Sequence, residues 1–294
     1  MQDLLLVNQI EASENRNMSH SEIDFSNAFY TRKLSRGAVS VLSAYPLYMQ
    51  AACMVKDNEL NFLTYTPCDM DVTVGGIKMT ISERTGYPFR NTVVFKVEHA
   101  NGEPEVKINF RVPKNVTMQL ISGGQVVATG STEISVKCVL RTGSTFMLKM
   151  NIPLTVEENA DGTYSLFKGN LLMSLKVPHE IKQDIKDRRT LCLNFAKKWN
   201  IAPLLARRLR GGMRELYEDE ITVVHDMTSV PFSGEKPPFE LRVRSKNVIN
   251  WDYDVNGFTE IPSRPVYSEE ALERVFVPFG CSLLRIAEFP KCLR

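Results

Sequence analysis

The chain has 294 residues, of which 43% are hydrophobic and 24% are charged, and its formal net charge is +2. These values describe an ordinary globular protein, and they exclude a disordered or collagen-like chain. They also argue against strong attraction to polyanions, so we expect nucleic acid not to be a partner. The apolar stretches are far shorter than the roughly 20 residues that a membrane-spanning helix requires, so we expect no membrane span.

The first segment, residues 1–25, is predicted to be a loose polar leader. No basic run precedes the short apolar stretch at residues 4–7, so we expect no secretory signal and a cytoplasmic protein. The cysteines form no Cys-x-x-Cys pair and stand mostly in apolar sequence, which favours buried free thiols. They are Cys53, Cys68, Cys138, Cys192, Cys281 and Cys292.

One helix is predicted before the strands begin. Ala38, Val41, Leu42 and Tyr45 recur at the spacing of one helical face, which indicates an amphipathic helix over residues 35–45. Pro46 is expected to end or kink this helix because proline lacks the amide hydrogen that the next turn needs.

From about residue 60 to residue 177 the hydrophobic period is two, which predicts an all-β region. Gly75 and Gly76 separate two such segments, and their freedom at positive φ suits a two-residue hairpin turn. Val106, Ile108 and Phe110 alternate with polar residues, so this strand should have one buried and one wet face.

Residues 179–216 interrupt the strand pattern, and we interpret 190–199 and 203–209 as helical. Strand patterns return at residues 241–243 and in a final pair at 275–277 and 283–286. In the last strand, Leu284 and Ile286 should face the core while Arg285 faces outward, because alternate side chains lie on opposite faces.

Several segments, read in order, carry a family resemblance. Residues 83–89 read ERTGYPF, residues 110–113 read FRVP, and the ending at 277–290 reads VPFGCSLLRIAEFP. Together they resemble the C-terminal half of glycoside hydrolase family 127, the β-L-arabinofuranosidase-like proteins once called domain of unknown function 1680.

The resemblance implies a mainly β chain of two antiparallel, jelly-roll-like β-sandwich domains, preceded by a remnant helix of an (α/α)6 barrel. On this basis we assign residues 26–55 to the last barrel helix and 56–155 to the first sandwich. Residues 156–294 form the second sandwich, with the helical insertion at about 179–216.

The family resemblance also associates catalysis with a zinc-held cysteine nucleophile and a glutamate acid/base, both in the barrel. The family's terminal pair of adjacent cysteines falls near Arg32, Lys33, Leu34 and Ser35 of this chain, and none of these is a thiol. No catalytic, cofactor-binding or metal-binding residue can therefore be carried over, and we expect the family's zinc site to be absent from this chain.

Two other features bear on function. Tyr87, Trp251 and Tyr253 are candidates for stacking on sugar rings, although aromatic side chains in sandwiches are more often part of the core. Residues 182–214 hold ten basic and two acidic side chains, which suits either a solvated face or a surface for RNA, an anionic membrane or an acidic partner.

These observations support three hypotheses. The first is a truncated or degenerate relative of family 127 with no hydrolase activity of its own, which retains surfaces for carbohydrate or for a barrel. The second is the C-terminal part of an active β-L-arabinofuranosidase whose (α/α)6 catalytic barrel lies on another chain or in sequence not included here. The third is a non-enzymatic interaction module that uses the basic insertion.

Overall fold

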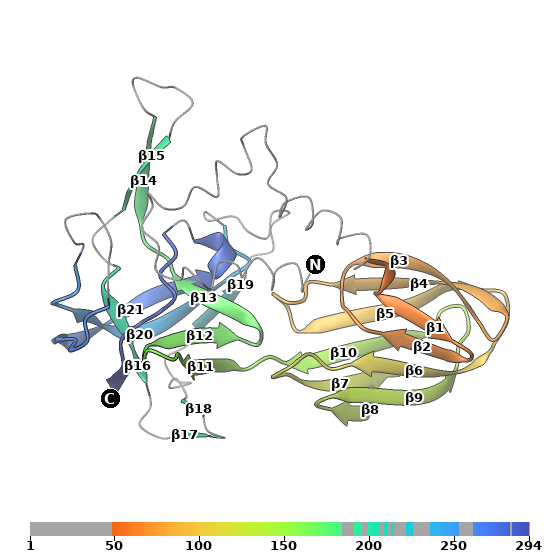
Figure 1. The fold of residues 1–294 in the computed structure, drawn as a ribbon. Coiled ribbons are helices and arrows are strands. Elements are labelled where there is room, and N and C mark those ends of the chain that lie inside the picture. The colour runs from red at the N-terminus through yellow and green to blue at the C-terminus, as the bar shows by residue number, and fades with distance from the viewer. Residues whose placement is uncertain are drawn as a thin grey trace. The chain divides into compact units, whose positions relative to one another are not determined.

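The computed structural model describes residues 49–183, 191–195, 199–205, 209–210, 213–214, 222–225, 236–252, 261–282 and 284–293. Within these residues the chain is mainly β, with its strands in a sandwich-like arrangement, as the sequence predicted (Figure 1). It divides into two compact units, one formed by the described residues up to Pro153 and the other by those from Leu154 onward. The predicted leader and the predicted helix at 35–45 lie outside the described residues.

The first unit is built from two sheets. One sheet has the strand order β1-β2-β6-β9, and the other has the order β3-β4-β5-β10-β7-β8 (Figure 1). The strands of the first sheet are β1 (Cys53–Lys56), β2 (Glu59–Phe62), β6 (Glu105–Arg111) and β9 (Glu133–Val139). Those of the second are β3 (Cys68–Val74), β4 (Ile77–Thr85), β5 (Thr92–Ala100), β7 (Thr117–Ser122), β8 (Gln125–Gly130) and β10 (Thr145–Asn151).

Most neighbouring strands are antiparallel, but β2 and β6 are parallel. A parallel pair needs a long crossover, and here the whole of β3, β4 and β5 lies between the two strands in the chain.

The sequence analysis assigned residues 26–55 to a barrel helix, and the C-terminal end of that range is different in the structure, because strand β1 begins at Cys53. Of that range the structure describes residues 49–55, in which only 49 and 50 are helical.

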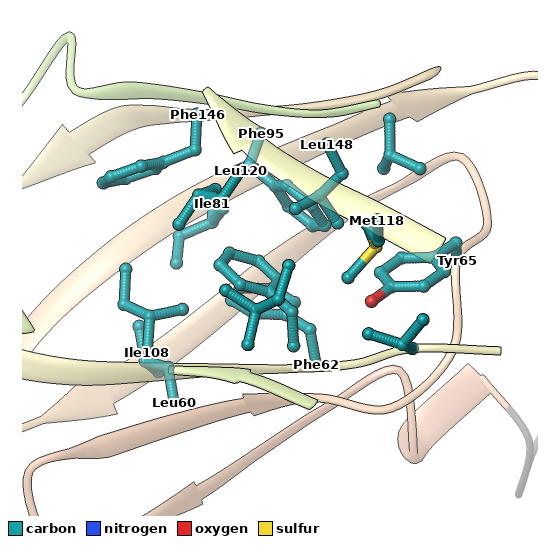
Figure 2. Packing of buried hydrophobic residues seen from close by; sticks show 14 of the residues in the cluster. Leu60, Phe62, Tyr65, Ile81, Phe95, Ile108, Met118, Leu120, Phe146 and Leu148 are labelled. Atoms are coloured by element: carbon teal, nitrogen blue, oxygen red, sulfur yellow. The ribbon is translucent and has the colours of Figure 1, made fainter. Parts of the chain in front are cut away.

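The core of the first unit lies between its two sheets. Figure 2 shows side chains from both layers, among them Phe62 and Phe95, pointing toward one another. The ring centroids of these two residues are 4.5 Å apart, and Phe110 stacks on Phe62 at 5.2 Å. Alternation on β6 explains the arrangement, because Val106, Ile108 and Phe110 are all at most 2% exposed.

The predicted hairpin at Gly75 and Gly76 is confirmed. Both glycines have positive φ, at 56° and 76°, and they join β3 to β4 in continuous antiparallel register. Positive φ at both central residues matches the right-handed twist of the strands on either side, and glycine adopts it without steric cost.

A close backbone approach marks the corner between β8 and β9. A Cβ atom placed on Gly130 would lie 2.5 Å from the carbonyl oxygen of Glu133 and 2.9 Å from Cγ1 of Ile134. The first of these atoms belongs to the backbone and cannot rotate away. Only glycine therefore fits at this corner without a shift of one strand.

We expect Gly130→Ala to destabilise the first unit by about 1–3 kcal/mol, the usual cost of forcing extra volume into a packed site. Urea denaturation followed by circular dichroism measures this change. The neighbouring Ser131→Ala, at an exposed position, is the matched control and should leave the midpoint unchanged. Equal midpoints for the two variants would contradict the proposed steric conflict.

The second unit contains a ten-stranded sheet. Its strand order is β17-β18-β11-β12-β13-β21-β20-β16-β22, with β19 pairing to β20, and β14 and β15 form a separate two-stranded sheet (Figure 1). The bounds are β11 (Leu154–Glu158), β12 (Tyr164–Lys168), β13 (Leu171–Leu175), β14 (His179–Gln183), β15 (Leu191–Phe195), β16 (Ile201–Leu205), β17 (Leu209–Arg210), β18 (Met213–Arg214), β19 (Thr222–His225), β20 (Phe239–Val248), β21 (Tyr267–Pro278) and β22 (Cys292–Leu293). The pair β16–β22 is parallel.

The prediction of a helical insertion at 179–216 is wrong for the described residues of that range. Strands β14 and β15 form an antiparallel hairpin, and β16 pairs with β20 and β22. All five residues of β16 are buried, so neither face shows the polar positions that mark a surface strand. A short apolar run of this kind has no diagnostic period, and here its sheet partners determine the outcome.

The ending of the chain is partly as predicted. Residues 275–277 lie within β21, but a short 3-10 helix (Phe279–Cys281) follows, and the described residues between 282 and 288 form no strand. This segment reaches the sheet by isolated bonds, such as that from the Leu175 amide to the Ile286 carbonyl oxygen at 2.8 Å. Leu284 and Ile286 are nevertheless buried, as the alternation indicated.

Arg285, between those two residues, is only partly exposed, although we expected it to face outward. Its guanidinium carbon lies 5.2 Å from the centroid of the Phe279 ring. An arginine can lie over an aromatic face and stay partly in water, which is why alternation alone misjudged its exposure. Across the described residues, the structure has no helix long and apolar enough to cross a membrane.

Candidate functional site

Two of the three aromatic candidates for sugar stacking are buried, whereas stacking on a sugar requires an open ring face. Trp251 is 1% exposed and Tyr87 is 9% exposed, so neither ring offers an open face. Tyr87 meets Tyr65 edge-on at 6.1 Å in the first unit, and Trp251 meets Trp199 edge-on at 5.3 Å in the second. Tyr253 lies outside the described residues.

The most unusual group in the first unit is Glu83 on β4, which is completely buried. Its Oε1 atom accepts a hydrogen bond of 2.8 Å from the backbone amide of Thr66. Its Oε2 atom is also buried and has no hydrogen-bond partner among the described residues. Burial disfavours the charged carboxylate and raises the pKa of Glu83 from 4.5 to about 8, against the opposing effect of the Thr66 amide.

The carboxyl group of Glu83 influences the pKa values of three other groups, the thiols of Cys53 and Cys68 and the phenol of Tyr65. Cys68 is the direct register partner of Glu83 on β3. Burial, with a smaller contribution from Glu83, raises the pKa of Cys53 to about 12 and that of Cys68 to about 11. The same two causes raise the pKa of Tyr65, whose hydroxyl donates a 2.6 Å hydrogen bond to the Arg111 carbonyl oxygen.

At neutral pH, therefore, the carboxyl group of Glu83 is mostly protonated and both thiols are neutral. A neutral thiol is a poor nucleophile and a poor metal ligand, and a carboxyl group with no exposed surface cannot reach a substrate. The cluster is thus suited to a structural role. Glu83 was not among the sequence-based candidates, although it lies at an alternate position of β4 on the same buried face as Met79 and Ile81.

The zinc chemistry suggested by the family resemblance finds no matching ligand set. In the part of the chain that the structure describes, there is no group of three or more histidine, cysteine, aspartate or glutamate side chains able to hold a metal ion. The protonated thiols of Cys53 and Cys68 do not fit a zinc site. Residues 32–35, where the family's paired cysteines would fall, lie outside the described residues.

Open grooves occur on both units. One of about 450 Å³ on the first unit has Glu103, Arg141 and three hydroxyl side chains in its lining. One of about 530 Å³ on the second unit has three prolines among its ten lining residues, together with Asp161, Glu288 and Lys291. Neither is lined by tyrosine or tryptophan. The side chains of the basic segment at 182–214 fall almost wholly outside the described residues, so the interaction-module hypothesis stays a prediction.

Comparison with known proteins finds no matching family model and no matching curated protein. Solved structures do match. A β-L-arabinofuranosidase of glycoside hydrolase family 127 from Geobacillus stearothermophilus T6 is 13% identical with a TM-score of 0.54, and the match covers 85% of this chain and 35% of that chain. A glycoside hydrolase is 15% identical with a TM-score of 0.59, with coverages of 90% and 41%.

A third similar structure, a β-arabinofuranosidase of family 127, is 13% identical with a TM-score of 0.50 and coverages of 83% and 37%. At such low identities the likeness concerns the fold. The chain spans between 35% and 41% of the length of these three proteins. The resemblance inferred from the sequence motifs is therefore confirmed as a likeness of fold. This chain has the same fold as part of each of these glycoside hydrolases, two of which are arabinofuranosidases of family 127.

Proposed function

We propose that this chain is a β-sandwich accessory protein of the family 127 type, related to the metabolism of L-arabinofuranosides, with no hydrolytic centre of its own. The observation that supports the proposal is the fold match, which covers most of this chain but only about two fifths or less of each similar glycoside hydrolase. In this role the chain supports a helical catalytic barrel or holds carbohydrate for it.

The chemistry of the described residues supports the non-catalytic part of this proposal. Glu83 is enclosed and mostly protonated, and the buried thiols of Cys53 and Cys68 are neutral at physiological pH. Cys138 and Cys292 form no disulfide among the described residues, which also supports a reducing, cytoplasmic location as part of the proposal.

We expect the purified chain to show no hydrolysis of an aryl β-L-arabinofuranoside above the buffer rate, with or without added zinc. The Geobacillus enzyme, assayed in parallel, is the positive control. Turnover that rises with protein concentration and persists through a second purification step, together with bound zinc, would overturn the proposal.

A second candidate is the C-terminal part of an active β-L-arabinofuranosidase, and the small share of each similar protein that is matched favours it. The mass of the polypeptide in cells that make it separates the first candidate from the form of the second in which the barrel lies on the same polypeptide. An antibody raised against this chain should detect a band of the mass of 294 residues if the first candidate is right. A band more than twice as large would favour the second candidate.

A further inference from the structure

The groove of about 450 Å³ on the first unit lies where strands of its two sheets end. Ser122 is the last residue of β7 and Thr145 the first of β10, both in the six-stranded sheet, whereas Val139 is the last residue of β9 in the four-stranded sheet. All three line the groove. Its volume is within the range of small-molecule sites, so we ask which ligand its lining suits.

Backbone hydrogen bonds hold the walls of this groove in place. The Leu140 amide donates to the Pro104 carbonyl oxygen at 3.1 Å. This bond keeps the neighbouring residues Glu103 and Arg141 on adjoining segments. The turn that follows is closed by two further bonds, from the Ser144 amide to the Arg141 carbonyl oxygen at 2.9 Å and from the Arg141 amide to Ser144 Oγ at 3.1 Å. The groove is therefore formed before a ligand binds, which spares the ligand the cost of ordering the chain.

The groove carries one negative and one positive side chain. Glu103 and Arg141 are both exposed, and neither side chain has a hydrogen bond or an ion pair with another described residue. A carboxylate only accepts hydrogen bonds and a guanidinium only donates them. A hydroxyl group does both, so one ligand rich in hydroxyl groups can satisfy the two side chains together. Glu103 would repel an anion and Arg141 would repel a cation, which favours a ligand without net charge.

We propose that this groove binds a sugar, whose hydroxyl groups bond to Glu103 and Arg141. Ser122, Ser144 and Thr145 add three hydroxyl side chains to the lining. The lining has no tyrosine or tryptophan, which suits a furanoside better than a pyranoside because a five-membered ring offers less apolar face for stacking. The choice of an L-arabinofuranoside rests on the proposed function, whereas the preference for an uncharged, hydroxyl-rich ligand follows from the groove.

An NMR titration of the isotope-labelled full chain with methyl β-L-arabinofuranoside tests the proposal. We expect saturable shifts of the Arg141 and Ser144 amide signals, with a Kd of roughly 1–10 mM because the site is open and has no stacking ring. Arg141→Ala and Glu103→Ala should each weaken binding about tenfold, since each removes a charged hydrogen-bonding group. Both positions are exposed, so the circular dichroism spectrum and the melting temperature should not change.

Arg111→Ala is the matched control. It removes an exposed arginine of the same unit that does not line the groove, so it should bind the sugar like the wild type. No saturable shift with the sugar, or binding that both groove variants retain, would overturn the proposal. So would a stronger response to inorganic phosphate or to spermidine than to the sugar, because the groove would then serve a charged ligand.

A failure of this inference can be told apart from a failure of the proposed function. Hydrolysis of the aryl β-L-arabinofuranoside is measured in a separate assay, and turnover there would overturn the proposed function without moving the binding curve of either groove variant. Methyl β-D-glucopyranoside provides the second distinction. If it binds and the arabinofuranoside does not, and if both groove variants lose that binding, the groove is upheld as a sugar site and its link to L-arabinofuranosides is overturned.

Discussion

The free energy of unfolding of the wild-type first unit should fall between about pH 5 and pH 8, and Glu83→Gln should remove most of this fall. The pKa of Glu83 is about 8 in the folded chain and 4.5 in the reference state. Between these values the unfolded chain has released a proton that the folded chain still holds, so unfolding becomes easier as the pH rises. The contribution lost by pH 8 is roughly 3–5 kcal/mol, at about 1.4 kcal/mol per pH unit.

Glutamine keeps the size of the side chain and cannot ionise, so the variant should be the more stable form at pH 8 and close to the wild type at pH 5. Urea denaturation at both pH values, followed by circular dichroism, measures the difference. Glu105→Gln, at an exposed position on β6, is the control for the removal of one carboxylate and should keep the wild-type dependence. Parallel profiles for the wild type and Glu83→Gln would show that Glu83 titrates normally.

Phe110→Ala should be the most damaging substitution in the core of the first unit, at about 3–5 kcal/mol. Phe110 is 0% exposed and stacks on Phe62, and its ring centroid lies 5.5 Å from that of Phe95 on the opposite sheet. The present cavity beside these rings is only about 10 Å³, so the truncated side chain would leave a void that rigid strands on both sides cannot close.

Urea denaturation followed by circular dichroism checks this value against Arg111→Ala. Arg111 is the next residue on β6 and its side chain is exposed, so its removal should change the stability by less than about 0.5 kcal/mol. A loss below about 1 kcal/mol for Phe110→Ala would mean that the two sheets can move together to fill the space.

The sequence predicted the parts of the fold that short-range chemistry controls. Gly75 and Gly76 allow one kind of hairpin turn, and the alternation on β6 leaves one face to bury, so both features are found as predicted. In each case the residues that decide the structure stand next to one another in the chain. The likeness to glycoside hydrolases was available from motifs in sequence order, before any contact was known.

Other parts depend on contacts between distant residues. Strand β16 joins β20 and β22, which lie about 40 and 90 positions further along the chain, so its apolar run was mistaken for helix. The exclusion of Tyr87 and Trp251 from the surface and the burial of Glu83 follow from the packing of whole sheets. The alternation of side chains along β4 places Glu83 on the inner face of the sheet. When only the sequence is read, a charged residue at such a position normally indicates the end of the strand.

The edge-on pair of Trp199 and Trp251 has a spectroscopic consequence. The chain contains two tryptophans, and both lie in the second unit at 1% exposure. Intrinsic indole fluorescence therefore arises from the second unit alone, and the first unit, whose core holds Tyr65 and Tyr87, is silent in that signal. The emission maximum and its quenching by iodide report directly on whether the second unit is folded, whatever the state of the first.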